Sequence, residues 1–494
     1  MIKLKSWKLV VTLVGILIAL TSLSMLLFAE SPTADLDKKT FAYLRHIREE
    51  KKNHTLEYFK GIESSARALS KDTFMLQKFM QMHNGIPITG SQERTIDEYF
   101  ISTYENFYDL LFVDSTGYVF HSIRQEEDYR KNLFDGKLND TNLAKSLKSS
   151  RSTSFSDFEY YYPSDESAAF FIVPVYSKNQ RIGWLILQCA INQVNKILTN
   201  HEQYGRTLEV YLVNNDDLML TDSRFIDDHT ILKLKVETES VRRAMMVRSG
   251  EELILDYRNE RVYSSFEKFE YFNASWVIIA EIDEAEIITE HYKRHKKYFN
   301  DQILKSLVEM KHLPSLTDLH SQEMTRVDVN EWSKALPGEV LYTSGVSSCT
   351  AYSIQYPGEF AYLAHISAID AVYGIDGLTK LILKDRSTNF VRELTKRVRF
   401  YDITLSELPR LEFMIIATHS KSFSLITEQL LDQGVELSNI RFIYNPEANR
   451  ASVNIDISSN QTLIAWNNGS NTFIESAQNY QTLGAILKST INSE

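Results

Sequence analysis

The chain has 494 residues, of which 43% are hydrophobic and 24% are charged, a composition typical of packed globular domains rather than of a disordered protein. At about 100 to 200 residues per domain, this length predicts several domains. The formal net charge of −11 would repel a phosphate backbone, which excludes nucleic acid as an expected partner.

An uncharged apolar segment near the N-terminus predicts a membrane anchor. The segment runs from Leu9 to Phe28, long enough as a helix to span the roughly 30 Å hydrocarbon core of a bilayer. Three lysines precede it and three acidic residues follow it: Lys3, Lys5, Lys8, Glu30, Asp35 and Asp37. Because positive flanks stay in the cytoplasm, we expect residues 1–30 to be a cytoplasmic tip and a single-pass anchor in a bacterial inner membrane, with the bulk of the chain periplasmic. A cleaved signal peptide is the alternative, although Leu27-Phe28-Ala29 is a poor cleavage site.

Residues 31–82 predict a long helix, because Gly and Pro are almost absent and apolar residues recur at helical spacing. A distal β-rich block follows at about residues 84–198, and a proximal one at about residues 199–290. In the distal block, LLFVDSTGYVFHS predicts a hairpin, and AAFFIVPVY and RIGWLILQCAI predict further strands. In the proximal block, LEVYLVNNDDLMLTDS predicts an opening hairpin, and ELILDY, RVYSSFEKF and WVIIAEI predict the strands that close it.

Ordered motifs across residues 31–290 resemble the double Cache sensors of chemoreceptors, sensor kinases and membrane cyclases. These motifs are YENFYDLLFVDSTGYVFHS, EEDYRKNL, SDFEYYYPSDESAAFFIVPV, EVYLVNNDDLMLTDSRF and WVIIAEIDEAEI. The resemblance implies a multidomain α+β and α/β chain in which a long helix carries two PAS-like lobes. It also implies that a small molecule usually binds in the distal lobe. TDSRF, with Asp222 and Arg224, is typical of the family's proximal lobe, although an ion pair within the domain explains it equally well.

Six polar and aromatic residues of the distal block are candidates for binding this ligand. They are Tyr108, Asp109, Asp128, Asp157, Tyr160 and Tyr161. Carboxylates can accept hydrogen bonds from an amine or polar metabolite, and aromatic faces exclude water or receive a cation. In the alternative interpretation the tyrosines pack, Asp157 caps a turn and Asp128 is solvated.

Residues 291–313 predict a charged amphipathic helix that links two bodies. His291 and His295 lie in this region without a cluster of carboxylates, so we expect neither a metal nor any other cofactor here. The long helix at residues 31–82 is compatible with a parallel homodimer.

Residues 314–494 predict an α/β domain, with strands EVLYTSGV, AYSIQY and EFAYLAHI and a helix LITEQLLDQG that ends at Gly434. Thr343 lies six residues before Cys349, and His365 lies sixteen residues after it. A thiol becomes a competent nucleophile when an imidazole takes its proton, and a hydroxyl can orient the imidazole. The alternative is an inert cysteine with an unrelated histidine. The other cysteine, Cys189, is so distant in sequence that a single bridge to Cys349 stays an open question.

Four segments of this domain together resemble the chemoreceptor glutamine deamidases of the CheD family, which convert receptor glutamine to glutamate. They are TSGVSSC, EFAYLAHIS, HSKSFSLITEQLLDQGVE and the hairpin IRFIYNPEANRASVNI. The resemblance implies an α/β sandwich in which Cys349 is the nucleophile, His365 the base and Thr343 the residue that orients the base. The family's Gly-Ser-Cys is Ser347-Ser348-Cys349 here, so a side chain replaces glycine in the turn that presents the thiol.

Two functions fit these parts. In the first, ligand binding to a membrane-anchored sensor controls a cysteine amidohydrolase, similar to a protein-glutamine deamidase, on the same side of the membrane. Its substrate would be an extracytoplasmic protein amide, because the glutamines of cytoplasmic receptors lie across the bilayer. In the second, the chain is a non-enzymatic signalling receptor for chemotaxis or a related response, and its last domain is a protein-docking module.

Overall fold

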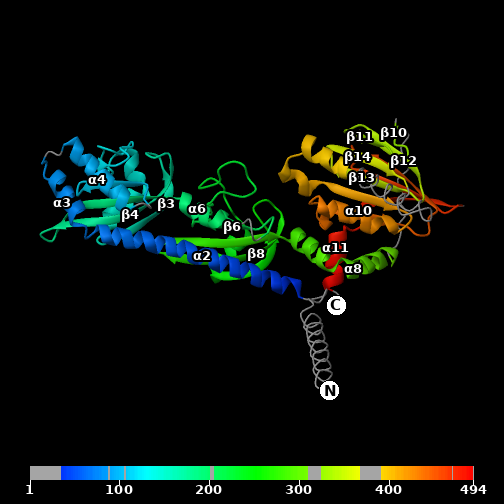
Figure 1. Cartoon of the computed structure of the whole chain (residues 1–494), viewed down its shortest axis with the longest axis horizontal. Coiled ribbons are helices and arrows are strands. Elements are labelled where there is room, and N and C mark those ends of the chain that lie inside the picture. Colours follow the sequence, from blue (N-terminus) through cyan, green and yellow to red (C-terminus); the bar gives the residue numbers. More distant parts are fainter. Residues whose placement is uncertain are drawn as a thin grey trace, which may run out of the picture. The chain divides into compact units, whose positions relative to one another are not determined.

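The computed structural model describes residues 35–86, 89–104, 107–200, 205–309, 324–367, 391–469 and 471–492. The chain divides into two compact units, of which one is Asp37–Glu284 and the other includes Ala285–Glu494 (Figure 1). The predicted anchor at residues 9–28 lies outside the described residues. Across those that are described, no helix is both long and apolar enough to cross a membrane.

The first unit begins with helices α2 (Leu36–Leu69), α3 (Thr73–His83) and α4 (Gly90–Thr103). Figure 1 shows α2 running lengthwise past both lobes of this unit. The prediction of one continuous helix to residue 82 is wrong, because α2 ends at Leu69 and a new helix starts after Asp72. The Asp72 carboxylate accepts a hydrogen bond from the backbone N–H of Met75 at 3.1 Å, which caps α3 and favours a helix start at this position.

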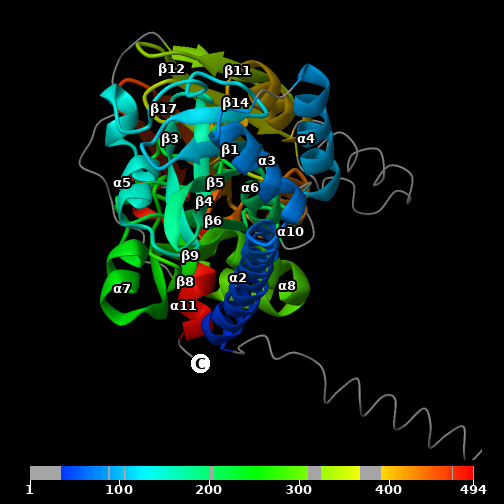
Figure 2. The ribbon, with the colours of Figure 1, turned by 90° about the vertical axis from the view of Figure 1, so that its left-hand side faces the viewer.

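The distal lobe is a five-stranded antiparallel sheet with the strand order β2-β1-β5-β4-β3. Its strands and helices are β1 (Asp109–Asp114), β2 (Val119–Ser122), η1 (Gly136–Asp140), α5 (Asn142–Ser149), β3 (Ser154–Tyr161), β4 (Glu166–Ser177), β5 (Gln180–Ala190) and α6 (Asn192–Thr199). Successive side chains of β1 point to opposite faces, so Leu111 packs with Leu143 of α5 while Phe112 packs against Phe79 of α3. The sheet is therefore covered on both faces, as Figure 2 shows. The predicted hairpin and strands of this block are confirmed.

The proximal lobe is a four-stranded antiparallel sheet with the order β6-β9-β8-β7. Its elements are β6 (Glu209–Val213), α7 (Glu239–Val247), β7 (Ser249–Leu255), β8 (Arg261–Tyr271) and β9 (Ala274–Asp283). The predicted opening hairpin is reduced to a single bridge between Val213 and Met219. Two backbone hydrogen bonds make this bridge, from the N–H of Asn214 to the carbonyl of Leu218 at 3.0 Å and from the N–H of Leu220 to the carbonyl of Leu212 at 2.8 Å.

The second unit begins with α8 (Glu284–Glu309), which contains a non-helical residue at His295. The side chains of Ile288, Tyr292 and Phe299 are buried in the core of this unit. The segment expected to link two bodies is thus helical over its described part and packs against the domain that follows it.

Two five-stranded sheets form the rest of the second unit, with the orders β10-β12-β17-β18-β19 and β11-β14-β13-β15-β16. The strands are β10 (Met324–Arg326), β11 (Trp332–Ala335), β12 (Val340–Val346), β13 (Thr350–Tyr356), β14 (Phe360–Ile366), β15 (Glu412–Ala417), β16 (Ile440–Tyr444), β17 (Arg450–Asp456), β18 (Gln461–Asn467) and β19 (Thr472–Ser476). The helices are α10 (Lys421–Asp432), α11 (Leu483–Asn492), a helix at residues 391–401, and the short helices η2 (Leu405–Arg410), η3 (Leu437–Asn439) and η4 (Ala477–Asn479).

These elements form three layers, because the sheet that contains β13 is covered on both faces. Ile354 and Phe413 face the helices, whereas Ala351 and Met414 face the other sheet. The three predicted strands and the helix ending near Gly434 are confirmed. The predicted hairpin at residues 440–455 is wrong, because β16 and β17 belong to different sheets and the turn between them crosses from one layer to the other.

Neither cysteine is in a disulfide bond. Cys189 is fully buried in β5, and this burial raises the pKa of its thiol. Cys189 is therefore a packed, unreactive thiol.

Two glycines should respond in opposite ways to replacement by alanine. A Cβ at Gly183 would lie 2.1 Å from the carbonyl oxygen of Val113, so Gly183→Ala should destabilise the distal lobe by about 1–3 kcal/mol. Gly61 lies on an exposed stretch of α2 with nothing within 4 Å of such a Cβ, so Gly61→Ala should stabilise the unit by about 0.5–1 kcal/mol. Melting temperatures of the two full-length variants test both signs. A fall in the Gly61→Ala variant would contradict the helix assignment.

Candidate functional site

An acidic cluster lies where strands β1, β3, β4 and β5 of the distal lobe meet the loop after β2. The hydroxyl of Tyr161 donates to the Asp128 carboxylate at 2.7 Å, and the hydroxyl of Tyr108 donates to Glu126 at 2.8 Å. Asp128 and Tyr161 are buried, and Tyr108 is partly buried. The sequence-predicted residues Tyr108, Asp128 and Tyr161 are therefore brought together.

Asp109 lies in the same region but is already satisfied by its own loop. Its carboxylate accepts hydrogen bonds from the hydroxyl of Ser122 at 2.8 Å and from the backbone N–H groups of Ile123 and Arg124 at 3.0 and 3.1 Å. These contacts hold the loop after β2 against β1. Asp109 thus shapes the cluster by fixing the loop that carries Glu126 and Asp128.

Three oxygen atoms of this cluster are buried and have no hydrogen-bond partner among the described residues. They are Oδ1 of Asp128, Oε2 of Glu126 and Oε1 of Gln188. Gln188 is the cross-strand neighbour of Asp109, and its Nε2 donates to Ser164 at 3.0 Å, so its amide oxygen is left as an acceptor. All three atoms accept hydrogen bonds and none donates one, unless a carboxyl is protonated.

The charges of the cluster act strongly on one another. Burial, with a smaller contribution from the neighbouring charge of Glu126, raises the pKa of Asp109 to about 6. Burial likewise raises the pKa of Asp128 to about 6, with added repulsion from Asp109 and Glu126. Arg124 supplies a nearby cation, and its guanidinium stacks over the Tyr108 ring with its central carbon 4.6 Å from the ring centroid. Proximity to further positive charge would stabilise these carboxylates.

Two of the six predicted residues lie elsewhere. Tyr160 is 58% exposed, and its hydroxyl donates to Asp165 in the turn after β3. The carboxylate of Asp157 accepts a hydrogen bond from the indole N–H of Trp276 at 2.9 Å, which joins β3 of the distal lobe to β9 of the proximal lobe. Burial raises the pKa of Asp157 to about 6. Asp157 thus lies at the junction of the lobes rather than in the acidic cluster.

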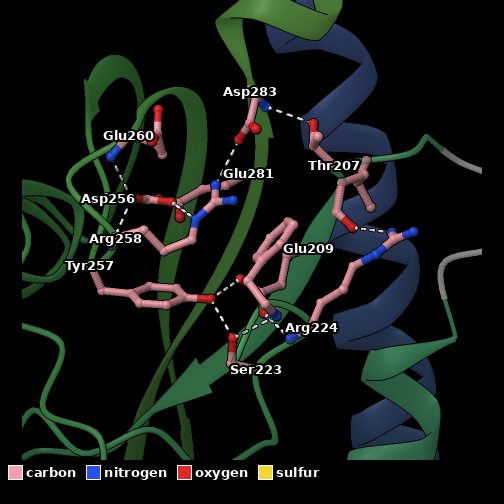
Figure 3. A network of polar contacts seen from close by, with 12 residues as sticks. Thr207, Glu209, Ser223, Arg224, Asp256, Tyr257, Arg258, Glu260, Glu281 and Asp283 are labelled. Atoms are coloured by element: carbon pink, nitrogen blue, oxygen red, sulfur yellow. Dashed lines mark hydrogen bonds and ion pairs between the residues drawn. The ribbon is translucent and has the colours of Figure 1, made fainter. Parts of the chain in front are cut away.

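A second buried polar network lies in the proximal lobe (Figure 3). Glu209 of β6 and Glu281 of β9 are cross-strand neighbours, and the hydroxyls of Tyr257 and Tyr211 donate to them respectively. Arg258 bridges Asp256 and Asp283, each at 2.6 Å. Burial raises the pKa of Glu281 to about 8, so this carboxyl is mostly protonated at neutral pH. Protonation of Glu281 removes the charge repulsion that it would otherwise have with Glu209 in this buried part of the sheet.

The TDSRF segment contributes to the same lobe by anchoring loops. Asp222 accepts hydrogen bonds from the side-chain amide of Asn195 at 3.0 Å and from the backbone N–H of Thr230 at 3.2 Å. The guanidinium of Arg224 donates to the carbonyl of Leu208 at 2.8 Å. The contacts with Thr230 and Leu208 are internal to the proximal lobe, whereas the contact with Asn195 joins it to α6 of the distal lobe.

The second unit brings Thr343 and His365 together between its two sheets. Thr343 Oγ1 lies 2.8 Å from His365 Nδ1 and 2.7 Å from the carbonyl oxygen of Val327. Since the hydroxyl donates its one proton to that carbonyl, it must accept from an N–H at Nδ1. The Nε2 atom of His365 is then the unprotonated nitrogen, and it is buried without a hydrogen-bond partner in the part of the chain that the structure describes. Burial also lowers the pKa of His365, which keeps the ring neutral and able to accept a proton.

Strand register indicates where Cys349 lies relative to this histidine. Ala351 of β13 pairs with His365 of β14, and Cys349 precedes Ala351 by two residues. Cys349 lies in the bend directly before Thr350, the first residue of β13, so it is next to the end of the strand that pairs with the strand of His365. Cys349 is partly exposed.

The backbone of the turn before Cys349 shows whether serine at position 347, where the CheD family has glycine, is strained. Gly345 has a φ of +78°, and Ser344 and Gly345 form a bulge opposite the single residue Ser452. Ser347 is not among the residues with positive φ. The left-handed residue is therefore Gly345, and serine at position 347 causes no backbone strain.

Sequence reasoning missed Glu126, Gln188 and Trp276. Glu126 lies in a motif quoted for its family likeness, EEDYRKNL, and two adjacent carboxylates before the buried Asp128 could have drawn attention to it. Gln188 reaches the cluster through the pairing of β5 with β1, and no local sequence signal predicts that register.

A two-lobed unit on a long helix, with unsatisfied acceptors in its distal lobe, has the architecture of a ligand-binding sensor. Residues 40–290, just over half of the chain, match the family described as the Cache domain. The chain belongs to this family, whose domains are extracytoplasmic sensors of membrane receptors.

Solved sensor domains are similar to the same part of the chain. The periplasmic sensory domain of the Campylobacter jejuni chemoreceptor Tlp1 shares 15% identity and a TM-score of 0.39, with 51% of this chain and 98% of that domain covered. The ligand-binding domain of the Pseudomonas aeruginosa amino acid chemoreceptor PctB, in complex with L-Arg, shares 17% identity and a TM-score of 0.36, with 50% and 96% covered. No curated protein matches the chain.

The protonation of Glu281 predicts how the stability of the chain depends on pH. The unfolded chain loses this proton near pH 4.5 and the folded one near pH 8, so between these values the folded state holds more protons. Stability should therefore fall as pH rises across this window, by up to about 1.4 kcal/mol per pH unit. Glu281→Gln, which cannot ionise, should flatten this fall in melting temperature.

Glu270→Gln, an exposed substitution on the neighbouring strand β8, is the matched control and should follow the parent chain. An equally steep fall in Glu281→Gln would mean that Glu281 is ionised in the folded protein.

Proposed function

We propose that this chain is a membrane-anchored extracytoplasmic sensor of an amine or other polar metabolite, coupled to a cysteine amidohydrolase of the protein-glutamine deamidase kind at residues 314–494. The sensor assignment rests on family membership and on the three buried acceptor oxygens of the distal lobe. The hydrolase assignment rests on the resemblance to the CheD family and on the tautomer of His365.

A primary ammonium group is the ligand chemistry that the distal cluster favours. It carries three N–H donors and a positive charge, and the cluster offers three acceptors among mutually repelling carboxylates. Tyr108 and Tyr161, which hold two of these carboxylates in place, add aromatic surface beside the cation.

The proposed hydrolase reaction uses Cys349, His365 and Thr343 in separate roles. His365 Nε2 takes the thiol proton, and the thiolate attacks the carbon of a side-chain amide to form a C–S bond. The imidazolium then gives its proton to the amide nitrogen, the C–N bond breaks and ammonia leaves a thioester. Water attacks the thioester while Nε2 takes a proton from it, and the C–S bond breaks to give the carboxylic acid and the thiol. Thr343 keeps the Nδ1–H tautomer throughout.

The substrate of this reaction would be a glutamine side chain of an extracytoplasmic protein. This follows from the predicted topology, which puts Cys349 on the side of the membrane opposite to cytoplasmic receptors.

A non-enzymatic receptor with a docking domain is the second candidate, and one observation favours it. Phe400 and Tyr401 end the helix at residues 391–401 and are 79% and 81% exposed. Adjacent exposed aromatic side chains are typical anchors of protein interfaces.

Ligand binding tests the sensor assignment. Panels of amines and amino acids should contain a compound that raises the melting temperature of the full chain. Asp128→Asn removes the charge that faces the ammonium, so it should weaken binding about tenfold to a hundredfold, as loss of a charged hydrogen bond of about 1.5–3 kcal/mol requires. Affinity should also fall below pH 6, where Asp109 and Asp128 take up protons.

Two variants outside the cluster complete this test. Asp165→Asn, in the exposed turn beside Tyr160, should bind as the parent does. Asp157→Asn should keep the parent's affinity within about threefold, because its carboxylate contacts Trp276 rather than the three acceptors. Unchanged binding in Asp128→Asn would remove the acidic cluster from the site.

Thiol reactivity tests the hydrolase assignment. Iodoacetamide should alkylate Cys349 of the folded chain faster than a model thiol at pH 7, because an adjacent imidazole lowers the pKa of the thiol below about 8.5. Cys189 should react slowly, because it is buried. His365→Ala should slow alkylation of Cys349 about tenfold or more at this pH. If Cys349 reacts as a model thiol and His365→Ala changes nothing, the docking function is the better one.

A further inference from the structure

Two side chains at the end of β15 hold the segment that leads into Cys349. The hydroxyl of Thr418 donates to the carbonyl oxygen of Ser347. The imidazole Nε2 of His419 lies 2.9 Å from the carbonyl oxygen of Ser348, to which it donates. These are the two peptide groups that directly precede Cys349, and each is fixed by a neighbouring side chain of the adjacent strand end.

Strand register explains why these side chains are in reach. Ala351 of β13 and Ile416 of β15 form the last pair of their ladder, and the Cys349 bend and Thr418 adjoin these two strand ends. On its other side β13 pairs with β14, which carries His365. Cys349 therefore follows a segment held by the end of β15 and directly precedes the strand that pairs with the strand of the base.

The backbone of this segment does not fix its own conformation. Gly345 begins it with a φ of +78°, which gives the chain freedom at the bulge. Ser347 and Ser348 lack the positive φ that a tight glycine turn would impose. The hydrogen bonds from Thr418 and His419 supply the missing constraint.

The hydrogen bond from His419 to the Ser348 carbonyl leaves the other ring nitrogen of His419 unsatisfied. Because Nε2 carries the proton that is donated to Ser348, Nδ1 is an acceptor, and it is buried without a hydrogen-bond partner among the described residues. An unsatisfied buried acceptor is unfavourable, so the contact with Ser348 is made although it leaves Nδ1 without a donor.

We propose that His419, assisted by Thr418, is a positioning residue that holds the Cys349 thiol beside Nε2 of His365. The inference rests on the proposed hydrolase function. It assigns no contact between His419 and the substrate, since its bond is to the Ser348 carbonyl. Without that bond the Ser347–Ser348 segment can shift at the bulge, and the thiol loses the neighbour that lowers its pKa.

The pH profile of Cys349 alkylation in the full chain tests this role. Peptide mass spectrometry follows iodoacetamide modification of Cys349 and Cys189 separately between pH 5 and pH 10. In His419→Ala the midpoint for Cys349 should rise by about one pH unit, a tenfold loss of rate near pH 7, while the rate at high pH stays within about threefold. Thr418→Val, which keeps the shape and removes the donor, should shift the midpoint in the same direction.

Two further variants separate positioning from folding. His419→Gln offers an amide N–H to the Ser348 carbonyl and should restore the midpoint to within about 0.3 units of the parent. Ser420→Ala, in the same turn, should leave the profile unchanged, because the Ser420 side chain does not cap α10. Rapid alkylation of Cys189 would reveal an unfolded variant, and Thr418→Val then carries the test.

The outcomes distinguish this proposal from the hydrolase assignment. If His365→Ala raises the midpoint while His419→Ala and Thr418→Val leave it in place, the positioning role is overturned and the hydrolase assignment stands. A His419→Gln profile equal to that of His419→Ala also overturns it, since the ring rather than the hydrogen bond would then matter. If neither His365→Ala nor His419→Ala moves the midpoint, both fail.

Discussion

A carboxyl group buried away from water must be hydrogen-bonded, paired with a cation or protonated, and this constraint organises the sensor unit. The proximal lobe meets it by protonation, because Glu281 lies beside Glu209 with a pKa of about 8, and by pairing, because Arg258 bridges Asp256 and Asp283. The distal lobe meets it only in part. Tyr161 and Tyr108 donate to Asp128 and Glu126, yet one oxygen of each carboxylate has no donor among the described residues. One oxygen of Glu281 also lacks a partner there, so the proposed distal site differs in that its acceptors without partners, on Asp128, Glu126 and Gln188, lie in one cluster.

In the last domain, the available hydrogen-bond donors and acceptors likewise determine which ring nitrogen of His365 carries the proton. The Thr343 hydroxyl has one proton, which it donates to the Val327 carbonyl, so the hydroxyl can only accept a hydrogen bond from His365. That requirement fixes which ring nitrogen is protonated and leaves Nε2 unprotonated. A serine or threonine whose hydroxyl lacked the carbonyl acceptor could turn and donate to Nδ1, which would place the proton on Nε2. The carbonyl of Val327 is therefore as important to the arrangement as the threonine itself.

Sequence patterns predicted the elements well and their connections less well. Continuous apolar runs identified β4, β5 and β9, because strands buried on both faces leave long hydrophobic runs. The hairpin expected at residues 440–455 failed because two strands separated by a short turn can pair or can cross between layers, and local sequence does not distinguish these outcomes. The helix break at Asp72 could have been predicted from the sequence. Aspartate is unfavourable inside a helix and favourable at the N-cap, which made Asp72 a candidate start of a new helix.

In the candidate sites too, residues that meet only through strand pairing could not be predicted from the sequence. Thr343 and His365 could be paired from the resemblance of their segments to the CheD family, whereas Gln188 joins Asp109, and the end of β15 meets the segment before Cys349, only through strand pairing. Register depends on which faces are buried across the whole sheet, and that information is not local. Asp157 was a candidate for the ligand site because it is one of the polar and aromatic residues in the strand ends and loops of the distal block. A bulge at Asp157 and Phe158, which together oppose Ala169, turns that part of β3 toward the proximal lobe.

This bulge gives β3 two distinct ends. At Tyr161 the strand contributes a hydroxyl to the acidic cluster, and at Asp157 it accepts a hydrogen bond from Trp276 of β9. Phe155 and Phe158, which flank Asp157, pack against Phe59 of α2 and against Trp276. Because aromatic contacts on both sides restrain the strand, a displacement at Tyr161 cannot be absorbed near Asp157 without disturbing the Trp276 contact. The distal lobe, the proximal lobe and α2 thus share one packed junction, and β3 is the strand that joins it to the acidic cluster.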